Sequence, residues 1–315
     1  QVAAEASEAA VTDLSASTFD STKARRQSVV ILKRFLRHRL AMISLGVFIA
    51  LVLFAFIGGA LWKYSYTFED TTGGGRYLAP SIDHPFGTDA LAADSLAQVL
   101  RGTQFSVIIA FVVAFLSTAI GVVLGSLAGY FRGWVDSVFS RFTDLVLVIP
   151  ALVLVGVLAR NSGSATSGSG GNWYIIALFL GLTGWTSVYR VIRGMTLSLR
   201  EKEFVEAARA LGGGVGRLVF RHILPNTLDV IIVNATIAVS QAVLAEAALS
   251  FIGLGVHPPN TSLGLLINVN DLEITLHPWL FWFPFVFIVL ISLCANFIGD
   301  GLRDAFDPRQ KRVRA

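Results

Sequence analysis

The sequence predicts an all-α, polytopic membrane protein that crosses the bilayer six times. Hydrophobic residues make up 54% of the 315-residue chain, charged residues only 15%, and the mean hydropathy is +0.67. Soluble domains carry about 25% charged residues, so this composition excludes a large soluble enzyme and a disordered chain. Crossing the hydrocarbon core takes roughly 20 mostly apolar residues. The stretches that meet this need are residues 40–62, 102–131, 138–159, 173–189, 228–251 and 280–299.

The distribution of lysine and arginine predicts the orientation of the chain. Of the 25 basic residues, 21 lie in alternate connections between the apolar stretches, and cytoplasmic connections are enriched in these residues. The expected cytoplasmic connections are residues 1–40, 130–144, 190–226 and 300–315. The chain then divides into a cytoplasmic N-terminal segment (1–39), a transmembrane domain (40–299) and a cytoplasmic C-terminal tail (300–315). Basic residues spaced in this way form no patch for nucleic acid.

The first apolar stretch is expected to remain in the membrane as an anchor. It is 23 residues long and follows a polar and basic segment of 39 residues, whereas the apolar part of a cleaved signal peptide has about 7–15. An outer segment, residues 63–101, follows. There His84 lies with Asp83 and Asp89 in a turn rich in proline and glycine. This spacing favours a turn and a helix cap over a metal site, so no metal is expected.

The second stretch carries a stripe of small residues. Ser117, Gly121, Gly125 and Gly129 recur every four residues, which places them on one face of a helix, where two backbones can approach closely in lipid. We therefore expect this face to pack tightly against another helix, within the subunit or in a partner. Lining a pore is the alternative.

Two carboxylates lie in or near the remaining stretches. Asp144 is near the inner end of the third beside Arg141, and Glu246 is near the outer end of the fifth. An aspartate within the membrane costs on the order of 2.5–3.5 kcal/mol on insertion scales, so such groups face protein or a water-filled interior. We expect structural roles or places at the edge of a cavity, with a proton relay as the alternative. Arg190 and Arg193, at the inner end of the fourth stretch, are expected to reach lipid headgroups.

The longest inner connection, residues 190–227, contains a predicted helix–hinge–helix. Residues 201–211 are rich in Glu, Ala, Arg and Leu, which favour a helix. Glycines 212–214 then end this helix, and a second amphipathic helix over residues 215–222 leads to Pro225, where the next helix starts or bends. Taken alone, this pattern is also that of a connector that covers the end of a bundle.

The inner connection resembles the EAA loop of the membrane-spanning subunits of ABC importers. Glu206-Ala207-Ala208, Gly212 and Ile223-Leu224-Pro225 carry this resemblance, and His222 fits the variant of the peptide-importer branch. The outer sequence His84-Pro85-Phe86-Gly87-Thr88-Asp89 resembles the HPxGTD motif of peptide permeases of the OppC/DppC type. Further matches are Gly129-Tyr130, Leu249-Ser250-Phe251, Gly253-Leu254-Gly255, Gly299-Asp300-Gly301-Leu302-Arg303-Asp304 and Asp307-Pro308. The matches run in order over residues 30–310, and the long N-terminal segment makes an oligopeptide permease C subunit the nearest type.

This resemblance implies a type I ABC importer permease (MetI-like) fold and a subunit of a complex in the bacterial cytoplasmic membrane. Such a subunit moves oligopeptides or dipeptides by alternating access and has no catalytic residues of its own. The implied partners are a homologous B-type permease subunit, two cytoplasmic ABC ATPase subunits or one fused ATPase, and an extracytoplasmic peptide-binding protein. Coupling to the ATPase is implied for residues of the inner connection: Glu203, Glu206, Ala207, Ala208, Gly212, Leu224 and Pro225. Related machinery imports nickel, haem or other small solutes.

ATP and Mg²⁺ are expected on the partner subunits and no cofactor on this chain. A P-loop requires a lysine directly after a glycine, to contact the phosphates, and none of the five lysines follows a glycine. Two alternatives of other classes remain. An ion-coupled secondary transporter or channel requires carboxylates near the middle of the membrane, and a membrane-embedded enzyme requires a cluster of catalytic groups.

Three departures from the family pattern weaken any inference about the substrate. Ala92 and Ala93 stand where the family usually has Gly-Arg, Leu263 stands where it has Trp, and Arg132 stands where it has Gly.

Overall fold

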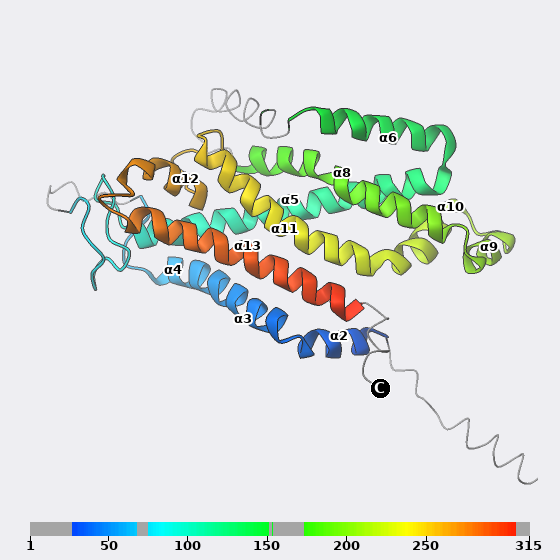
Figure 1. The fold of residues 1–315 in the computed structure, drawn as a ribbon, viewed down its shortest axis with the longest axis horizontal. Coiled ribbons are helices and arrows are strands. Elements are labelled where there is room, and N and C mark those ends of the chain that lie inside the picture. Colours follow the sequence, from blue (N-terminus) through cyan, green and yellow to red (C-terminus); the bar gives the residue numbers. More distant parts are fainter. Residues whose placement is uncertain (1–26, 68–74, 151–152, 154–172, 307–315) are drawn as a thin grey trace, which may run out of the picture.

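The computed structural model describes residues 27–67, 75–150, 153 and 173–306 as an elongated bundle of helices (Figure 1). Within these residues no strand is present beyond an isolated bridge between Thr88 and Asp94. Helices long and apolar enough to cross a membrane run over Arg39–Leu61, Ser95–Phe131, Trp173–Leu199, Val215–Phe251 and Trp279–Phe306. They match the first, second, fourth, fifth and sixth predicted spans. The all-α, polytopic fold class is confirmed.

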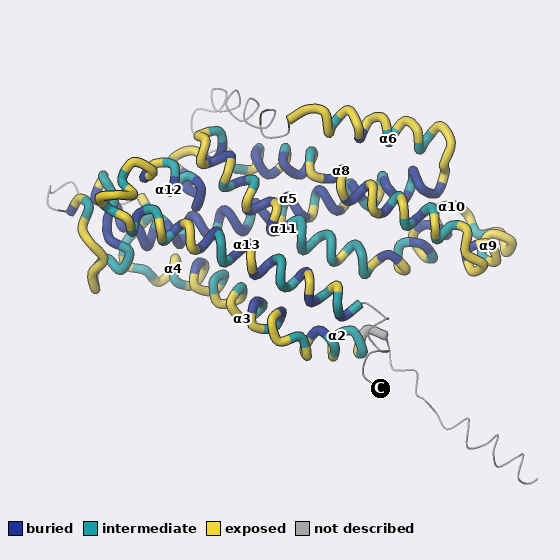
Figure 2. The backbone as a smooth tube through the Cα atoms, in the orientation of Figure 1, coloured by how far each residue is buried: buried dark blue, intermediate teal, exposed yellow. Residues whose placement is uncertain are grey.

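The predicted third span is described only in its first part. Helix α6 (Gly133–Val148) contains residues 138–148, and most of residues 149–159 lie outside the described part of the chain. Figure 2 shows α6 exposed along almost its whole length, and only Thr143 is buried. It touches α8 (Trp173–Leu199) through a stacked pair of rings, Phe142 and Trp185, and a 3.1 Å hydrogen bond between Ser140 and Tyr189.

The first span lies at the edge of the bundle and packs against the last helix. It consists of α2 (Gln27–Arg37), α3 (Arg39–Leu53), the π-helical turn η1 (Phe54–Gly58) and the short α4 (Gly59–Leu61). His38 accepts a hydrogen bond from the amide of Ala41 and so caps α3. Its other ring nitrogen lies 3.3 Å from Asp304 of α13 (Trp279–Phe306). This link fixes the first span beside α13.

The small-residue stripe of α5 (Ser95–Phe131) lies against α8. A Cβ at Gly121 would lie 2.8 Å from the carbonyl oxygen of Trp185, and one at Gly125 would lie 2.8 Å from that of Tyr189. At Gly129 the corresponding distance to the carbonyl oxygen of Arg193 is 2.7 Å. Ser117, the fourth position of the stripe, is buried and lies opposite Gly184. At the three glycines, the two backbones are therefore too close for a side chain.

The main core fills the half of the bundle that contains α12 (Leu263–Val269). There α5, α8, α11 (Leu228–Phe251) and α13 contribute interlocking apolar side chains, and the 3₁₀ turn η4 (Asp271–Glu273) leads from α12 toward α13. The fully buried members include Ile109, Ile176, Val243, Leu249 and Leu263. One end of the bundle, here called the cap end, carries residues 75–94 and α12. The opposite end, the loop end, carries α9 (Glu203–Ala210), α2 and the last turns of α13 (Figure 1).

Several helices are longer than the apolar stretches that predicted them. Helix α5 begins at Ser95 because Asp94 caps its first turn, accepting a 2.8 Å hydrogen bond from the amide of Ala97. Helix α8 continues ten residues past the predicted end at Tyr189. Its arginines do not extend toward headgroups alone: Arg190 donates to Asp144 at 3.1 Å, and Arg193 pairs with Asp136. The carboxylates of α6 thus balance the positive charges of these two arginines within α8.

Candidate functional site

The connection between α8 and α11 forms a compact structure at the loop end. Helix α9 is followed by α10 (Val215–Arg217), the π-helical turn η2 (Leu218–Ile223) and the 3₁₀ turn η3 (Leu224–Thr227). The observed helix α9 is shorter than the expected 201–211. Pro225 lies in the first turn of η3, directly before α11. Residues 201–225 are called the coupling loop below.

Helix α9 ends in a Schellman motif built on two glycines. Gly212 has a φ of +79°, a left-handed conformation that L side chains rarely adopt. Its amide donates to Arg209 O, and the amide of Gly213 donates to Ala208 O, both at 3.0 Å. A Cβ at Gly213 would lie 2.6 Å from that same oxygen, whereas Gly214 has open space around it. The glycine run therefore contains two positions where glycine is required and one where it is not.

One face of α9 is fixed to the bundle by a small core of its own. Val205 is fully buried there against Tyr130, Leu218, Val219 and Ile223. Ala208 and Leu224, two of the predicted coupling residues, pack at the edge of this core. Since Tyr130 belongs to the last turn of α5, the core joins the coupling loop directly to that helix.

The opposite face of α9 is exposed. Glu203, Glu206, Ala207 and Ala210, spaced as on one side of a helix, have no cover within the described residues. We call these four residues the docking face. Three apolar side chains of the coupling loop are exposed as well: Phe204 by 42%, Leu211 by 88% and Phe220 by 63%. An apolar surface that faces water usually marks an interaction site.

The sequence reasoning did not single out these apolar residues or Tyr130 as a junction. Phe204 and Phe220 stand in short amphipathic helices at positions that the small core leaves outside. That mismatch between apolar residue and exposed position is the signal that would have found them. Tyr130 appeared only as part of a matching dipeptide, and its partners are far away in the sequence.

Arginines hold the base of the coupling loop to the end of α5. Arg200 donates to the carbonyl oxygen of Tyr130, and its guanidinium lies 5.6 Å from the centre of the Tyr130 ring. Arg132 pairs with Glu201 at 2.5 Å. Arg132 itself has a φ of 57°, in a region where glycine is the usual residue. The family usually has glycine at position 132. In this chain a strained arginine occupies the position and contacts the coupling loop.

The outer motif at residues 84–94 forms a cap for α5. Asp94 is buried and accepts hydrogen bonds at 2.8 Å from the ring nitrogen of Trp62 and from the amide of Ala97. Its second oxygen lies 2.8 Å from Nδ1 of His84. Asp89 accepts from two backbone amides and from Gln98. Through these hydrogen bonds, the carboxylates of Asp89 and Asp94 stabilise the turn that precedes α5.

Glu246 is fully buried near the cap end, where it joins three helices. It accepts hydrogen bonds from Ser106 of α5 at 2.8 Å and from Ser250 of α11 at 2.7 Å. Ser250 in turn contacts Ser262, which caps α12. The sequence predicted a place near the outer end of a span but not its serine partners. Ser106 and Ser262 come from other segments, and Ser250, one helical turn after Glu246, appeared only as part of a family motif.

The fold defines a polytopic, all-α membrane protein. Residues 121–312 match the family described as binding-protein-dependent transport system inner membrane component. Residues 27–80 match the N-terminal transmembrane domain of oligopeptide transport permease C. The chain belongs to this family of binding-protein-dependent permeases, with the N-terminal domain of the oligopeptide permease C type.

Individual relatives agree with this assignment. The oligopeptide transport system permease protein OppC of Mycobacterium tuberculosis (strain H37Rv) is 41% identical over 292 residues, which cover 92% of this chain and 97% of the relative. The protein of the same name from Haemophilus influenzae is 36% identical over 281 residues, with 89% and 88% covered. Among solved structures, a chain of the inward-facing MetNI methionine ABC transporter aligns with a TM-score of 0.51 at 19% identity. It covers 65% of this chain and 96% of that chain, so the type I importer fold is shared.

Proposed function

We propose that this chain is the C-type permease subunit of an ATP-driven importer of oligopeptides in the cytoplasmic membrane. The relatives named for oligopeptide transport support the substrate class, since two of them match along nearly the whole chain. The partners in this proposal are a homologous B-type permease, cytoplasmic ATPase subunits that bind ATP and Mg²⁺, and an external peptide-binding protein. The partner binding protein selects among peptides and other small solutes.

The observation that carries the proposal is the contrast between the two faces of α9. The inner face is fixed by Val205 and its small core, while the docking face is exposed with two carboxylates and two small alanines. A partner can approach closely over Ala207 and Ala210, and Glu203 and Glu206 can pair with its basic groups. Exposed Phe204 provides an apolar anchor beside them. This is a surface suited to a protein partner rather than a plain connector.

The contacts at the base of the loop give a route for mechanical coupling. A partner that displaces α9 also displaces Tyr130, because both belong to one buried cluster. Tyr130 ends α5, and the small-residue stripe prevents α5 from separating easily from α8. ATP binding and hydrolysis in the partner would therefore move α5 and α8 together, which gives alternating access when the second permease moves in the opposite sense.

The arrangement of the ends is consistent with the predicted orientation. Helix α2, the last turns of α13 and α9 lie at the same end of the bundle, and residues 75–94 lie at the other (Figure 1). We place the loop end in the cytoplasm with both termini, because most lysines and arginines lie in those connections.

The test is peptide uptake by the complete complex in vesicles, with Gly212→Val compared with Gly214→Val. A valine at Gly212 is forced into a left-handed conformation, whereas Gly214 has an extended backbone and open space. We expect Gly212→Val to insert normally and to lose at least about tenfold in uptake per ATP hydrolysed, since about 1–2 kcal/mol of strain displaces the docking face. Gly214→Val should transport like the wild type.

Normal coupled uptake by Gly212→Val would contradict the proposed role of the loop. Purification from native membranes without any ATPase subunit, together with uptake driven by an ion gradient, would favour a secondary transporter instead. If nickel or haem stimulated ATP hydrolysis and peptides did not, the proposed substrate class would be wrong. The proposed ATP-driven import would still stand.

A further inference from the structure

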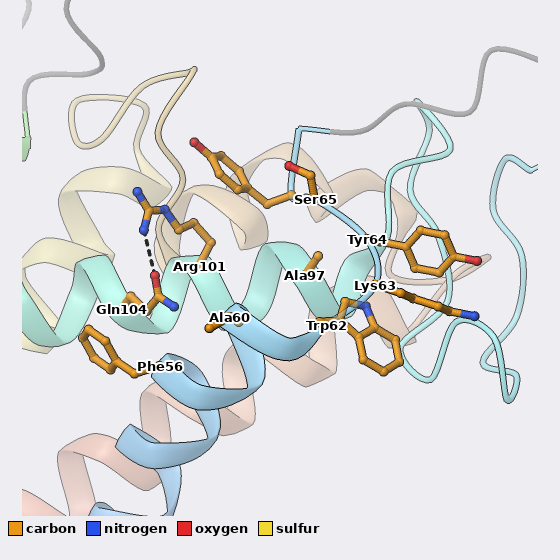
Figure 3. A pocket seen from close by; sticks show the side chains of 11 residues that line it. Phe56, Ala60, Trp62, Lys63, Tyr64, Ser65, Ala97, Arg101 and Gln104 are labelled. Carbon is orange, nitrogen blue, oxygen red and sulfur yellow. Dashed lines mark hydrogen bonds between the residues drawn. The ribbon is translucent and has the colours of Figure 1, made fainter.

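A second candidate binding site lies at the cap end, outside the coupling loop and the outer motif. A cavity of about 560 Å³ opens between α4 and the first turns of α5. Figure 3 shows its labelled side chains: Phe56, Ala60 and Trp62 on one side, Arg101 and Gln104 of α5 on another, and Lys63 and Tyr64 along the chain that leaves α4. The cavity thus combines aromatic rings with two cationic groups.

The two cations differ in how far their charges are already paired. Lys63 lies 2.7 Å from Asp83, and this contact lowers the pKa of the Asp83 carboxyl, so the ammonium has a carboxylate partner. Arg101 donates from Nη1 to Gln104 at 2.8 Å. Its buried Nε has no hydrogen-bond partner, and within the described residues the guanidinium has no carboxylate partner. Among the residues that the structure describes, Arg101 therefore has no acceptor of opposite charge.

The surroundings of Arg101 hold its guanidinium in place. The ring of Phe105 lies 4.5 Å and that of Tyr66 lies 5.3 Å from its central carbon. Gln104 is itself fixed, because its amide nitrogen donates to Ala55 O at 2.7 Å. With Nη1 bound to Gln104 and Nε buried, Nη2 is the guanidinium nitrogen that remains for a ligand. A guanidinium N–H forms a strong, charge-assisted hydrogen bond to a phosphate or a carboxylate.

The position of the cavity favours a lipid over a transported solute. Leu61 ends the first span, and Arg101 directly precedes the apolar part of α5, so the cavity lies at the level of the outer membrane surface. The adjoining face of η1 and α4 is apolar and exposed at Phe56, Ile57 and Leu61. Aromatic residues such as Trp62 and Tyr64 are typical of the interface between lipid and water.

We propose that this cavity binds the headgroup of an outer-leaflet phospholipid, with the phosphate on Arg101 and the acyl chains along the exposed face of η1 and α4. A phosphate can accept a charge-assisted hydrogen bond from Nη2 of Arg101. The lipid would then fill the space beside the contact between Gln104 of α5 and Ala55 of the first span. The terminal carboxylate of a peptide can form the same kind of hydrogen bond. The test below distinguishes a carboxylate ligand from a phosphate ligand.

The test measures lipid binding by native mass spectrometry of the purified full-length chain in detergent. The probes are dioleoyl phosphatidylglycerol and dioleoylglycerol, which has the same chains without the phosphate. Arg101→Gln should weaken binding of the phospholipid about tenfold, which corresponds to losing one charge-assisted contact, and should leave dioleoylglycerol unchanged. Arg76→Gln is the matched control, because Arg76 is an exposed arginine of the cap end that does not line the cavity. Its phospholipid affinity should equal that of the wild type.

A second variant keeps Arg101 and fills the cavity instead. Ala60 is exposed and lines the cavity, so Ala60→Phe should also weaken phosphatidylglycerol binding. Wild-type affinity in both Arg101→Gln and Ala60→Phe would overturn the proposal. It would also be overturned if tri-alanine bound in an Arg101-dependent manner, tri-alanine amide did not, and phosphatidylglycerol showed no dependence on Arg101. That result would assign the cavity to a peptide carboxylate.

Discussion

The two ends of the bundle use charged residues in opposite ways. At the cap end, Asp94 is buried and each of its oxygens has partners from other segments. At the loop end, Glu203 and Glu206 are exposed, and no partner is present among the described residues. A carboxylate whose hydrogen bonds are complete stabilises the fold, whereas an exposed one on a fixed helix is available to another molecule. The difference separates the part of the molecule that maintains the architecture from the part suited to interaction.

The largest effect on stability is expected from Asp94→Ala at the cap end. The change removes the cap of α5 and leaves Trp62 and His84 without their shared acceptor. Removing one member of a buried, hydrogen-bonded polar set costs about 3 kcal/mol, so the thermal unfolding midpoint of the purified protein should fall by several degrees. Asp83→Ala is the control, because Asp83 makes only an exposed pair with Lys63 and should change stability by less than about 1 kcal/mol. Equal effects of the two variants would contradict the distinction between buried and exposed carboxylates.

A smaller effect of opposite sign is expected from Ala92→Gly in the same cap. Ala92 has a φ of 60°, a left-handed conformation in which a Cβ costs about 1–2 kcal/mol relative to glycine. Glycine also increases the entropy of the unfolded chain, so the net gain should be about 1 kcal/mol in the free energy of unfolding. A thermal shift measurement with Ala93→Gly as the control tests this. The cap would not be strained at Ala92 if the two variants behaved alike.

The smallest effect on stability is expected from Glu206→Lys at the loop end. Glu206 lies on the docking face, so its replacement should change the free energy of unfolding by less than about 0.5 kcal/mol. The same change should greatly reduce the amount of ATPase subunit that purifies with the complex, because the charge of the face is reversed. Asp271→Lys, the same change at an exposed position of the cap end, should retain the ATPase. Retention in Glu206→Lys would show that the docking face lies elsewhere.

Patterns within one segment made most of the fold predictable. Long apolar stretches identified every membrane-length helix that the structure describes, and the spacing of Gly121, Gly125 and Gly129 identified the face of α5 along which α8 packs. The predicted helix boundaries were less accurate where side chains from elsewhere decide them. Asp94 starts α5 seven residues before the apolar stretch, and Asp136 supports Arg193 within α8.

Contacts between distant segments are what the sequence could not provide. Tyr130 joins the coupling loop to α5 through Val205 and Arg200, which are about 70 residues away. Ser106, which donates to Glu246, likewise lies on another helix, 140 residues away in the sequence. No periodicity relates such positions, because the chain brings them together only when the helices pack. At the coupling loop, the family motifs predicted the candidate residues although the contacts between distant segments were not predictable.

The glycine stripe also determines which measurements can follow a transport cycle. Because a Cβ at Gly121, Gly125 or Gly129 would collide with the backbone of α8, we expect the two helices to move together, and a pair of spectroscopic labels on them should read a nearly constant distance. The junction after α5 is different, because Arg132 and Gly133 both have positive φ angles and α6 has few buried contacts. Labels on α5 and α6 therefore lie on opposite sides of this junction. The distance between them should change when the conformation changes.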